Sequence, residues 1–158
     1  MQRLHSYWRM PYIEIPQGKK GGNPFLEIPK QDPKEVHLVW KGQYSYIVMN
    51  KFPYNCGHLL VIPLRQVADL EELSPEERAE YFEAIIKAKQ ILAKAMKPDA
   101  FNIGFNLGAK AGAGIPEHLH CHVVPRWDGD TNFMPVISDT RVLPQAMDAL
   151  WERLIQFV

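Results

Sequence analysis

The sequence has little cysteine, no net charge and no long apolar run, and each shortage excludes a class of protein. Only Cys56 and Cys121 occur among 158 residues, too few for a disulfide framework, and we expect both thiols to be reduced. Eighteen basic and eighteen acidic residues cancel, which gives no reason to expect a nucleic acid or a membrane surface as partner. No segment approaches the roughly 18 consecutive apolar residues of a membrane span, and the first residues lead into no signal-peptide core. We therefore expect a cytoplasmic protein that binds neither nucleic acid nor membrane.

The composition is that of a globular domain, with 46% hydrophobic and 23% charged residues. Proline and glycine recur so often in residues 1–35 that we expect a loop-rich N-terminal arm there. From residue 36 the pattern becomes regular, and the length suffices for one core. We therefore expect a single domain over residues 36–158.

Short apolar segments bounded by turn residues predict five strands. They cover residues 36–40, 44–50, 58–63, 101–107 and 118–124. Connections as short as those between the first three strands favour antiparallel pairing.

One long helix is signalled by its ends. Ser74, Pro75 and Glu77 form a capping box with proline at the first helical position, and Pro98 stops the helix. We expect its apolar residues to cover the core: Phe82, Ile85, Ile86, Leu92 and Met96. A second helix is expected near residues 144–157. The predicted fold is α+β: a five-stranded antiparallel sheet, one long covering helix and a C-terminal helix.

Three histidines alternate in the last predicted strand: His118, His120 and His122. Successive strand side chains point to opposite faces, so the three imidazoles share one face at a spacing of roughly 6.6 Å. The residues between and after them are apolar and suited to burial on the other face: Leu119, Cys121 and Val123. This face of the sheet is the candidate site.

Aligned imidazoles support two chemistries. Two of them could ligate zinc, but a catalytic zinc site needs a further ligand, and this segment offers no suitable carboxylate. Alternatively, one neutral imidazole attacks an electrophile while its neighbours donate hydrogen bonds. The glycine-rich loop before the strand favours a phosphate electrophile, because backbone N–H groups around Gly112 and Gly114 can cradle anionic oxygens, with Asn106 at the loop entrance.

The histidine run resembles the His-φ-His-φ-His-φ-φ signature of the histidine triad superfamily of nucleotide hydrolases and transferases. Further segments resemble its branch of diadenosine tetraphosphate phosphorylases and fragile-histidine-triad hydrolases. They are residues 49–63, 106–108, 117–127 and 129–133, with a weaker similarity at 8–12.

The resemblance implies a role for each histidine. His120 is implied as the nucleophile that accepts a nucleotidyl group, with His118 supporting its ring. His122 is implied to contact the phosphoryl and leaving oxygens. His58 matches a position implied either to support the triad or to be purely structural.

The resemblance also implies substrate contacts and a reaction. Asn106, Gly112 and Gly114 match phosphate-binding positions, and Asn50 matches a ribose-side position. The implied reaction is cleavage of a dinucleoside polyphosphate, such as diadenosine tetraphosphate, through a nucleotidyl-histidine that phosphate or water resolves. Phosphorolysis is preferred on the segments around Tyr54 and 125–127. A metal-dependent phosphohydrolase and a nucleotide sensor without turnover are the alternatives.

Departures from the family pattern bear on the cofactor and on the substrate. Zinc-binding relatives carry a Cys-x-x-Cys pair where this chain has Asn23 and Leu26, so a zinc site is not expected. Ile115 replaces the serine of branches that cleave nucleoside phosphoramidates, which argues against that chemistry. We expect no required cofactor and Mg²⁺ only as carried by the substrate. The resemblance also implies a homodimer formed through the long helix and a sheet edge.

Overall fold

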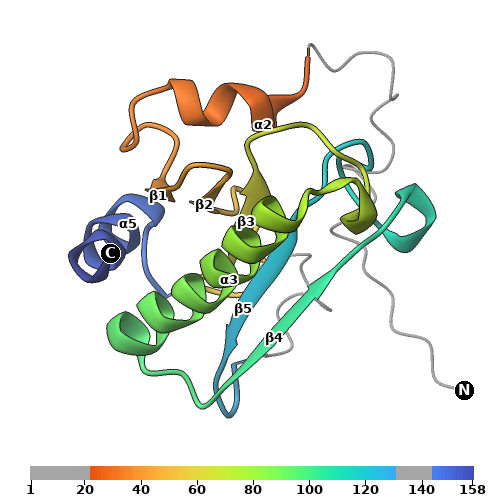
Figure 1. The fold of residues 1–158 in the computed structure, drawn as a ribbon. Helices are drawn as coiled ribbons and strands as arrows, with labels where there is room; N and C mark the ends of the chain where they lie inside the picture. The colour runs from red at the N-terminus through yellow and green to blue at the C-terminus, as the bar shows by residue number, and fades with distance from the viewer. Residues whose placement is uncertain (1–21, 131–143) are drawn as a thin grey trace, which may run out of the picture.

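The protein is described by a computed structural model that covers residues 22–130 and 144–158. Five strands form one antiparallel sheet in the order β1-β2-β3-β5-β4 (Figure 1). They are β1 (Leu38–Lys41), β2 (Ser45–Met49), β3 (Leu59–Pro63), β4 (Ala100–Phe105) and β5 (Cys121–Arg126). The predicted α+β class and the number of strands are confirmed.

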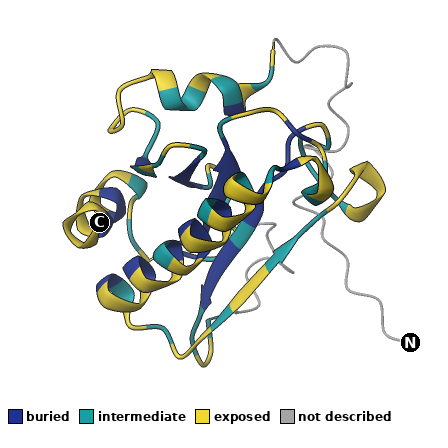
Figure 2. Ribbon diagram, in the orientation of Figure 1, coloured by how far each residue is buried: buried dark blue, intermediate teal, exposed yellow. Residues whose placement is uncertain are grey.

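The long helix α3 (Pro75–Met96) lies across one face of this sheet (Figure 1). Its start is the predicted capping box: the Ser74 hydroxyl accepts the Glu77 N–H at 3.2 Å, and the Glu77 carboxylate accepts the Ser74 N–H at 2.8 Å. Its end is Lys97, which adopts a left-handed φ of 50°. Figure 2 shows buried residues on the side of α3 that faces the sheet. The core therefore lies between α3 and the sheet.

Two of the helix residues predicted to cover this core are exposed instead. Phe82 keeps 64% and Ile86 keeps 36% of its surface, and Ile103 on β4 keeps 45%. The helix buries smaller residues such as Ala84 and Ala88, which let it pack closely on the sheet. β4 is an edge strand, and Figure 2 shows it as largely exposed.

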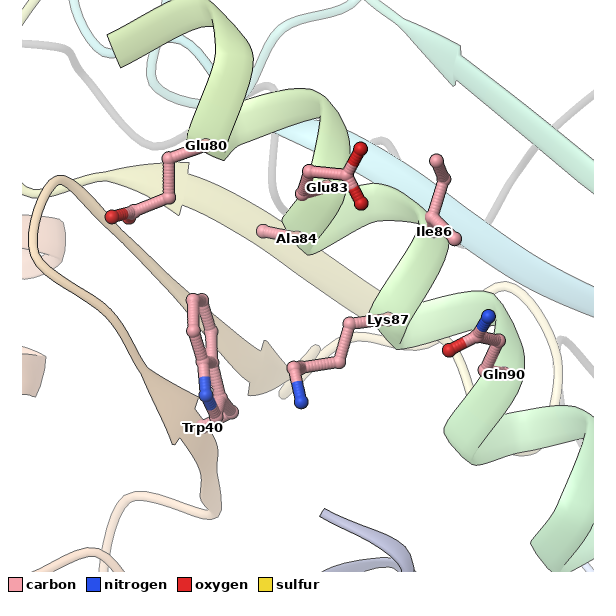
Figure 3. A pocket seen from close by; sticks show the side chains of 7 residues that line it. All are labelled: Trp40, Glu80, Glu83, Ala84, Ile86, Lys87 and Gln90. Carbon is pink, nitrogen blue, oxygen red and sulfur yellow. The ribbon is translucent and has the colours of Figure 1, made fainter. Parts of the chain in front are cut away.

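Glu80 ties α3 to the turn between β1 and β2. Its carboxylate accepts the backbone N–H groups of Gln43, Tyr44 and Ser45 at 2.8–3.1 Å, together with the Ser45 hydroxyl at 2.9 Å. Figure 3 shows Glu80 above Trp40, and the Lys87 ammonium lies 5.6 Å from the centroid of that indole. A cavity of about 220 Å³ lies at this point and is lined by Trp40 and by residues of α3.

The C-terminal helix α5 (Met147–Leu154) continues into a 3-10 turn, η6 (Ile155–Phe157), and so occupies most of the range predicted for it. It packs against the first strand, since the Trp151 indole N–H donates to the Leu38 carbonyl at 2.9 Å. No helix in the described residues is long and apolar enough to cross a membrane.

The described part of the predicted arm is more regular than expected. It contains a four-residue helix, α2 (Pro24–Glu27), and a 3-10 turn, η3 (Ile28–Lys30). Pro24 is compatible with this helix because it stands at the first helical position, where no N–H is needed. Phe25 is buried, and its carbonyl accepts the Tyr46 hydroxyl at 2.8 Å. Residues 1–21 of the arm lie outside the described residues, and the boundary at residue 35 stays a prediction.

Candidate active site

The histidine segment enters the sheet later than predicted. Its strand, expected over 118–124, begins at Cys121 and continues through Pro125 to Arg126. Residues before Cys121 are held differently: the Leu119 N–H donates to the Val67 carbonyl at 2.7 Å rather than to a neighbouring strand. The alternation itself is confirmed by the two clusters that the side chains join. Leu119, Cys121 and Val123 belong to the main core, whereas the rings of His118 and His120 contact Phe25 of a second cluster. We call the opposite side of the sheet, which carries His120 and His122, the histidine face.

His120 has the geometry of a neutral nucleophile. Its Nδ1 lies 2.8 Å from the His118 carbonyl oxygen. A carbonyl can only accept, so Nδ1 carries the proton and Nε2 carries the lone pair. Nε2 has no hydrogen-bond partner among the described residues, where every buried side-chain nitrogen or oxygen has one, so it reaches solvent although the residue is only 6% exposed. Burial lowers the pKa of His120 from its ordinary 6.5 and keeps the ring uncharged.

His118 supports this arrangement from a fully buried position. Its Nε2 donates to the Pro63 carbonyl at 2.8 Å, which leaves Nδ1 to accept from the Asn23 amide at 2.9 Å. Burial lowers the pKa of His118 as well. His118 therefore acts through its backbone carbonyl, which holds the ring of His120, and its own ring is not presented to substrate.

A second pair of histidines fixes a donor beside the nucleophile. The backbone N–H of Tyr54 donates to Nδ1 of His58 at 2.9 Å, so the His58 proton sits on Nε2. That nitrogen lies 2.9 Å from Nδ1 of His122 and donates to it. His122 consequently carries its own proton on Nε2. Its ring centroid is 5.1 Å from that of His120, so an N–H donor stands next to the nucleophilic lone pair.

The predicted substrate contacts are partly brought together. The Asn106 side-chain amide lies 3.4 Å from Nε2 of His122, so both groups border the same space. Because this Nε2 carries a proton, the amide has to present its oxygen to it. Asn50 lies beside His58, with its amide nitrogen 3.3 Å from Nδ1. In the glycine loop, the N–H of Gly112 closes a local turn onto the Ala109 carbonyl at 3.0 Å. Phosphate binding by Gly112 and Gly114 stays a prediction.

Three residues around the histidines were missed by the sequence analysis. Phe25 meets the rings of His118 and His120 edge-on, with centroids 5.5 and 5.2 Å away. Asn23 caps α2 and also donates to His118, as described above. The Asn23-Pro24 pair does predict a helix start, but a contact 95 residues distant leaves no local signal.

Tyr54 belongs to one of the segments that resemble the family, and its ring also borders the site. It stacks on His122 with a centroid distance of 5.3 Å and an interplanar angle of 18°. It also lies 4.5 Å from the ring of His58. An aromatic residue in a turn carries no sequence signal for this contact.

The fold and the site define an α+β domain with a cluster of histidines on one face of its sheet, and similarity to known proteins identifies the family. The HIT domain family model matches residues 31–129, and the chain belongs to that family. An AP-4-A phosphorylase of Mycobacterium tuberculosis is 42% identical over 154 residues, which are 93% of this chain and 79% of the relative. An asymmetrical bis(5'-nucleosyl)-tetraphosphatase of Schizosaccharomyces pombe is 35% identical over 98 residues, 62% of this chain and 53% of that relative.

Solved structures share the fold. A histidine triad nucleotide-binding protein from Sulfolobus tokodaii superposes with a TM-score of 0.69 at 22% identity, covering 85% of this chain and 91% of that one. A zinc-bound histidine triad protein from Mycobacterium smegmatis gives a TM-score of 0.66 at 22% identity, over 84% and 89% of the two chains.

The residues of this chain do not fit the zinc site implied for some relatives. The resemblance places Asn23 and Leu26 at the thiol positions of zinc-binding relatives, and neither residue supplies a thiolate. Both ring nitrogens of His118 are already engaged, one by Asn23 and the other by the Pro63 carbonyl. Asn23 also donates to the Gln66 side chain at 3.1 Å, so hydrogen bonds occupy this position.

Proposed function

We propose that the protein cleaves dinucleoside polyphosphates, with diadenosine tetraphosphate as the expected substrate, through a covalent nucleotidyl-His120 intermediate. The observation that carries the proposal is the state of His120. Its Nδ1 is held by the His118 carbonyl, while its uncharged Nε2 is directed to solvent beside a donor on His122. The names of the two relatives support the substrate class.

In the first step, Nε2 of His120 attacks the α-phosphorus of the substrate. An N–P bond forms as the P–O bond to the bridging oxygen breaks, and the leaving nucleotide departs with the bonding electrons. The Nε2–H of His122 lies where it can donate to the phosphoryl or leaving oxygen, and Asn106 borders the same space. The Nδ1–H of the resulting imidazolium continues to donate to the His118 carbonyl.

In the second step, an acceptor attacks the same phosphorus and breaks the N–P bond. Orthophosphate as acceptor yields ADP, and water yields AMP, with ATP as the other product in each case. We favour orthophosphate because of the motifs around Tyr54 and residues 125–127, and the AMP-forming reaction differs only in this acceptor.

Product analysis tests this proposal. The protein is incubated with diadenosine tetraphosphate with and without orthophosphate, and nucleotides are separated by ion-exchange chromatography. ADP plus ATP formed only with orthophosphate is the expected result, whereas AMP plus ATP in either case indicates hydrolysis. Binding without products would contradict the proposal and favour a nucleotide sensor.

A metal-dependent phosphohydrolase would lose activity when its metal ion is removed by a chelator. Within residues 22–130 and 144–158, no group of three or more histidine, cysteine or acidic side chains is arranged to hold a metal ion. We propose that no resident metal or other cofactor is required and that Mg²⁺ enters only with the substrate. Prior dialysis against a chelator, followed by assay with Mg²⁺ restored, should leave activity intact.

We also propose that two chains form a homodimer. Phe82 and Ile86 on α3 and Ile103 on the edge strand β4 are exposed apolar side chains that a second copy could cover. β4 additionally leaves one edge of the sheet unpaired within the described residues. A cytoplasmic location remains a prediction.

A further inference from the structure

A small hollow lies on the histidine face beyond His122. Its volume is about 170 Å³, and the described residues that line it are Tyr54, Asn55, Asn102, Val124 and Arg126. Val124 and Arg126 follow His122 at alternate positions of β5, so their side chains share its face. Asn102 on β4 pairs directly with Val124 and therefore also faces this side.

The hollow lies on the side of the nucleophile away from the predicted ribose contact. Asn50 follows β2, which is separated from β5 by β3, whereas the floor of the hollow is formed by β5 and β4. When the α-phosphate of the substrate lies at His120, the nucleoside attached to that phosphate can bind on the β2 side of the sheet. The leaving nucleotide then lies on the β4 side. Tyr54 connects the two regions, because it lines the hollow and stacks on His122.

The lining suits a flat aromatic ring. Tyr54 keeps 39% of its surface exposed, although it packs on His122. The Arg126 guanidinium is held in one plane by the Asp130 carboxylate at 2.6 and 2.9 Å and by the Asn102 carbonyl oxygen at 2.7 Å. Aromatic rings and oriented guanidinium groups are the surfaces on which nucleobases stack.

The hollow also offers a polar contact and a size limit. The carbonyl oxygen of Asn102 accepts from Arg126, and its amide N–H₂ has no partner among the described residues. That group can donate to a ring nitrogen of a base. The volume of about 170 Å³ is below the roughly 300 Å³ at which pockets begin to enclose a whole drug-sized ligand. A base fits this size, and the ribose and phosphates would lie outside.

We propose that this hollow binds the base of the departing nucleotide and that Tyr54 is its stacking platform. The inference rests on the proposed function, because it assigns the second nucleoside of the same substrate. It explains how the site would distinguish a dinucleotide from a mononucleotide with the same phosphate chain. The base of the leaving nucleotide stays stacked until that nucleotide is released, so stacking stabilises the bound substrate and the transition state equally. Such uniform binding raises kcat/KM.

The experiment compares diadenosine tetraphosphate with adenosine tetraphosphate, which has the same phosphates and no second nucleoside. The quantity measured is the ratio of the two kcat/KM values, from which any general effect on the chemistry cancels. For the wild type we expect a ratio of about ten or more. Tyr54→Ala should bring the ratio close to one, Tyr54→Phe should restore most of it, and Asn102→Ala should lower it severalfold.

Phe52→Ala is the matched control, because Phe52 is an exposed aromatic residue of the same loop that does not line the hollow. It should leave the ratio unchanged. If the wild type cleaves both substrates equally well, or if Tyr54→Ala slows both to the same extent, this inference is overturned while the proposed function stands. If the wild type cleaves neither substrate, both are overturned.

Discussion

Two carbonyl oxygens and one backbone N–H decide where the protons lie among the site histidines. The His118 carbonyl accepts a hydrogen bond from Nδ1–H of His120, and the Pro63 carbonyl accepts one from Nε2–H of His118. The backbone N–H of Tyr54 donates to Nδ1 of His58, so the proton of His58 lies on Nε2. This Nε2–H donates to Nδ1 of His122, so the proton of His122 also lies on Nε2. The result is one free lone pair and one adjacent donor, as attack on a phosphorus atom requires.

The lowered pKa values of His118 and His120 predict how stability depends on pH. In the unfolded chain these rings titrate near the ordinary value of about 6.5. As the pH falls below that value, the unfolded chain binds protons that the buried rings do not, so the free energy of unfolding decreases. The decrease is at most about 1.4 kcal/mol per pH unit for each ring.

Urea unfolding at pH values between about 7.5 and 5 measures this dependence. His120→Gln removes one of the two titrating rings and should show a shallower decrease than the wild type. A decrease of equal slope in both proteins would show that His120 titrates normally in the native state.

Removing His58 should slow the reaction without unfolding the protein. In His58→Leu nothing holds the proton of His122 on Nε2, so we expect kcat to fall roughly tenfold. That is less than the 10² to 10³ typical of deleting a transition-state donor outright. His58→Gln, whose amide can donate to Nδ1 of His122, should recover most of the rate. Equal losses in both variants, at unchanged thermal midpoints, would contradict the tautomer role.

At the scale of elements, the site depends on where regular structure stops. β3 ends at Pro63, whose carbonyl is then available to His118, and β5 begins only at Cys121. α2 positions Phe25, whose ring contacts those of His118 and His120 edge-on. The nucleophile is therefore positioned by the ends of three elements.

Glu80 should be a strong contributor to stability, because one carboxylate satisfies three backbone N–H groups and a hydroxyl in the β1–β2 turn. Ser45 is only 1% exposed, so its N–H would lose its partner without access to water. We expect Glu80→Ala to lower the free energy of unfolding by about 2 kcal/mol. Glu83→Ala, on an exposed position of the same helix, should change it by less than about 0.5 kcal/mol. Chemical denaturation compares the two, and similar values would contradict the role of Glu80.

The sequence predicts those elements that carry their own signals. Ser74, Pro75 and Glu77 mark the start of α3 because capping is local, and the strands follow from alternation. Burial on α3 is not local: Phe82 has the spacing of a core residue but lies outside the helix face that packs on the sheet.

The candidate site divides in the same way. The three histidines are predicted as site residues by their alternate spacing, and the resemblance assigns them roles. Phe25 and Asn23 reach His118 from nearly a hundred residues away, and Tyr54 reaches His122 from a different loop. Such contacts exist only after the chain has folded, so no pattern in the sequence predicts them.

At the scale of the whole molecule, the two faces of the sheet have separate tasks. One face is closed by α3 and carries the main core, while the other carries the histidines and a smaller apolar cluster that includes Phe25 and Leu60. Ile103 lies on β4 at one end of the sheet order, and α5 packs at the other end, by β1. A second copy that pairs along β4 would therefore lie at the edge of the sheet opposite to α5.

Sedimentation analysis tests the dimer. Charged substitutions on the exposed apolar surface, Phe82→Glu or Ile103→Lys, should convert the dimer to a monomer, because a buried unpaired charge is costly at an interface. Ile155→Lys, on an exposed residue of the C-terminal turn η6, is the control and should leave the dimer intact. A monomeric wild type would contradict this prediction.

The nucleotidyl group on His120 is the most direct test of the proposed mechanism. Protein mixed with diadenosine tetraphosphate without orthophosphate is quenched in base, where a phosphoramidate persists, and its peptides are analysed by mass spectrometry. We expect one adenylyl group on the peptide containing His120, lost on addition of orthophosphate before the quench and absent from His120→Asn. Turnover by His120→Asn, or an adenylyl group on another residue, would contradict the mechanism.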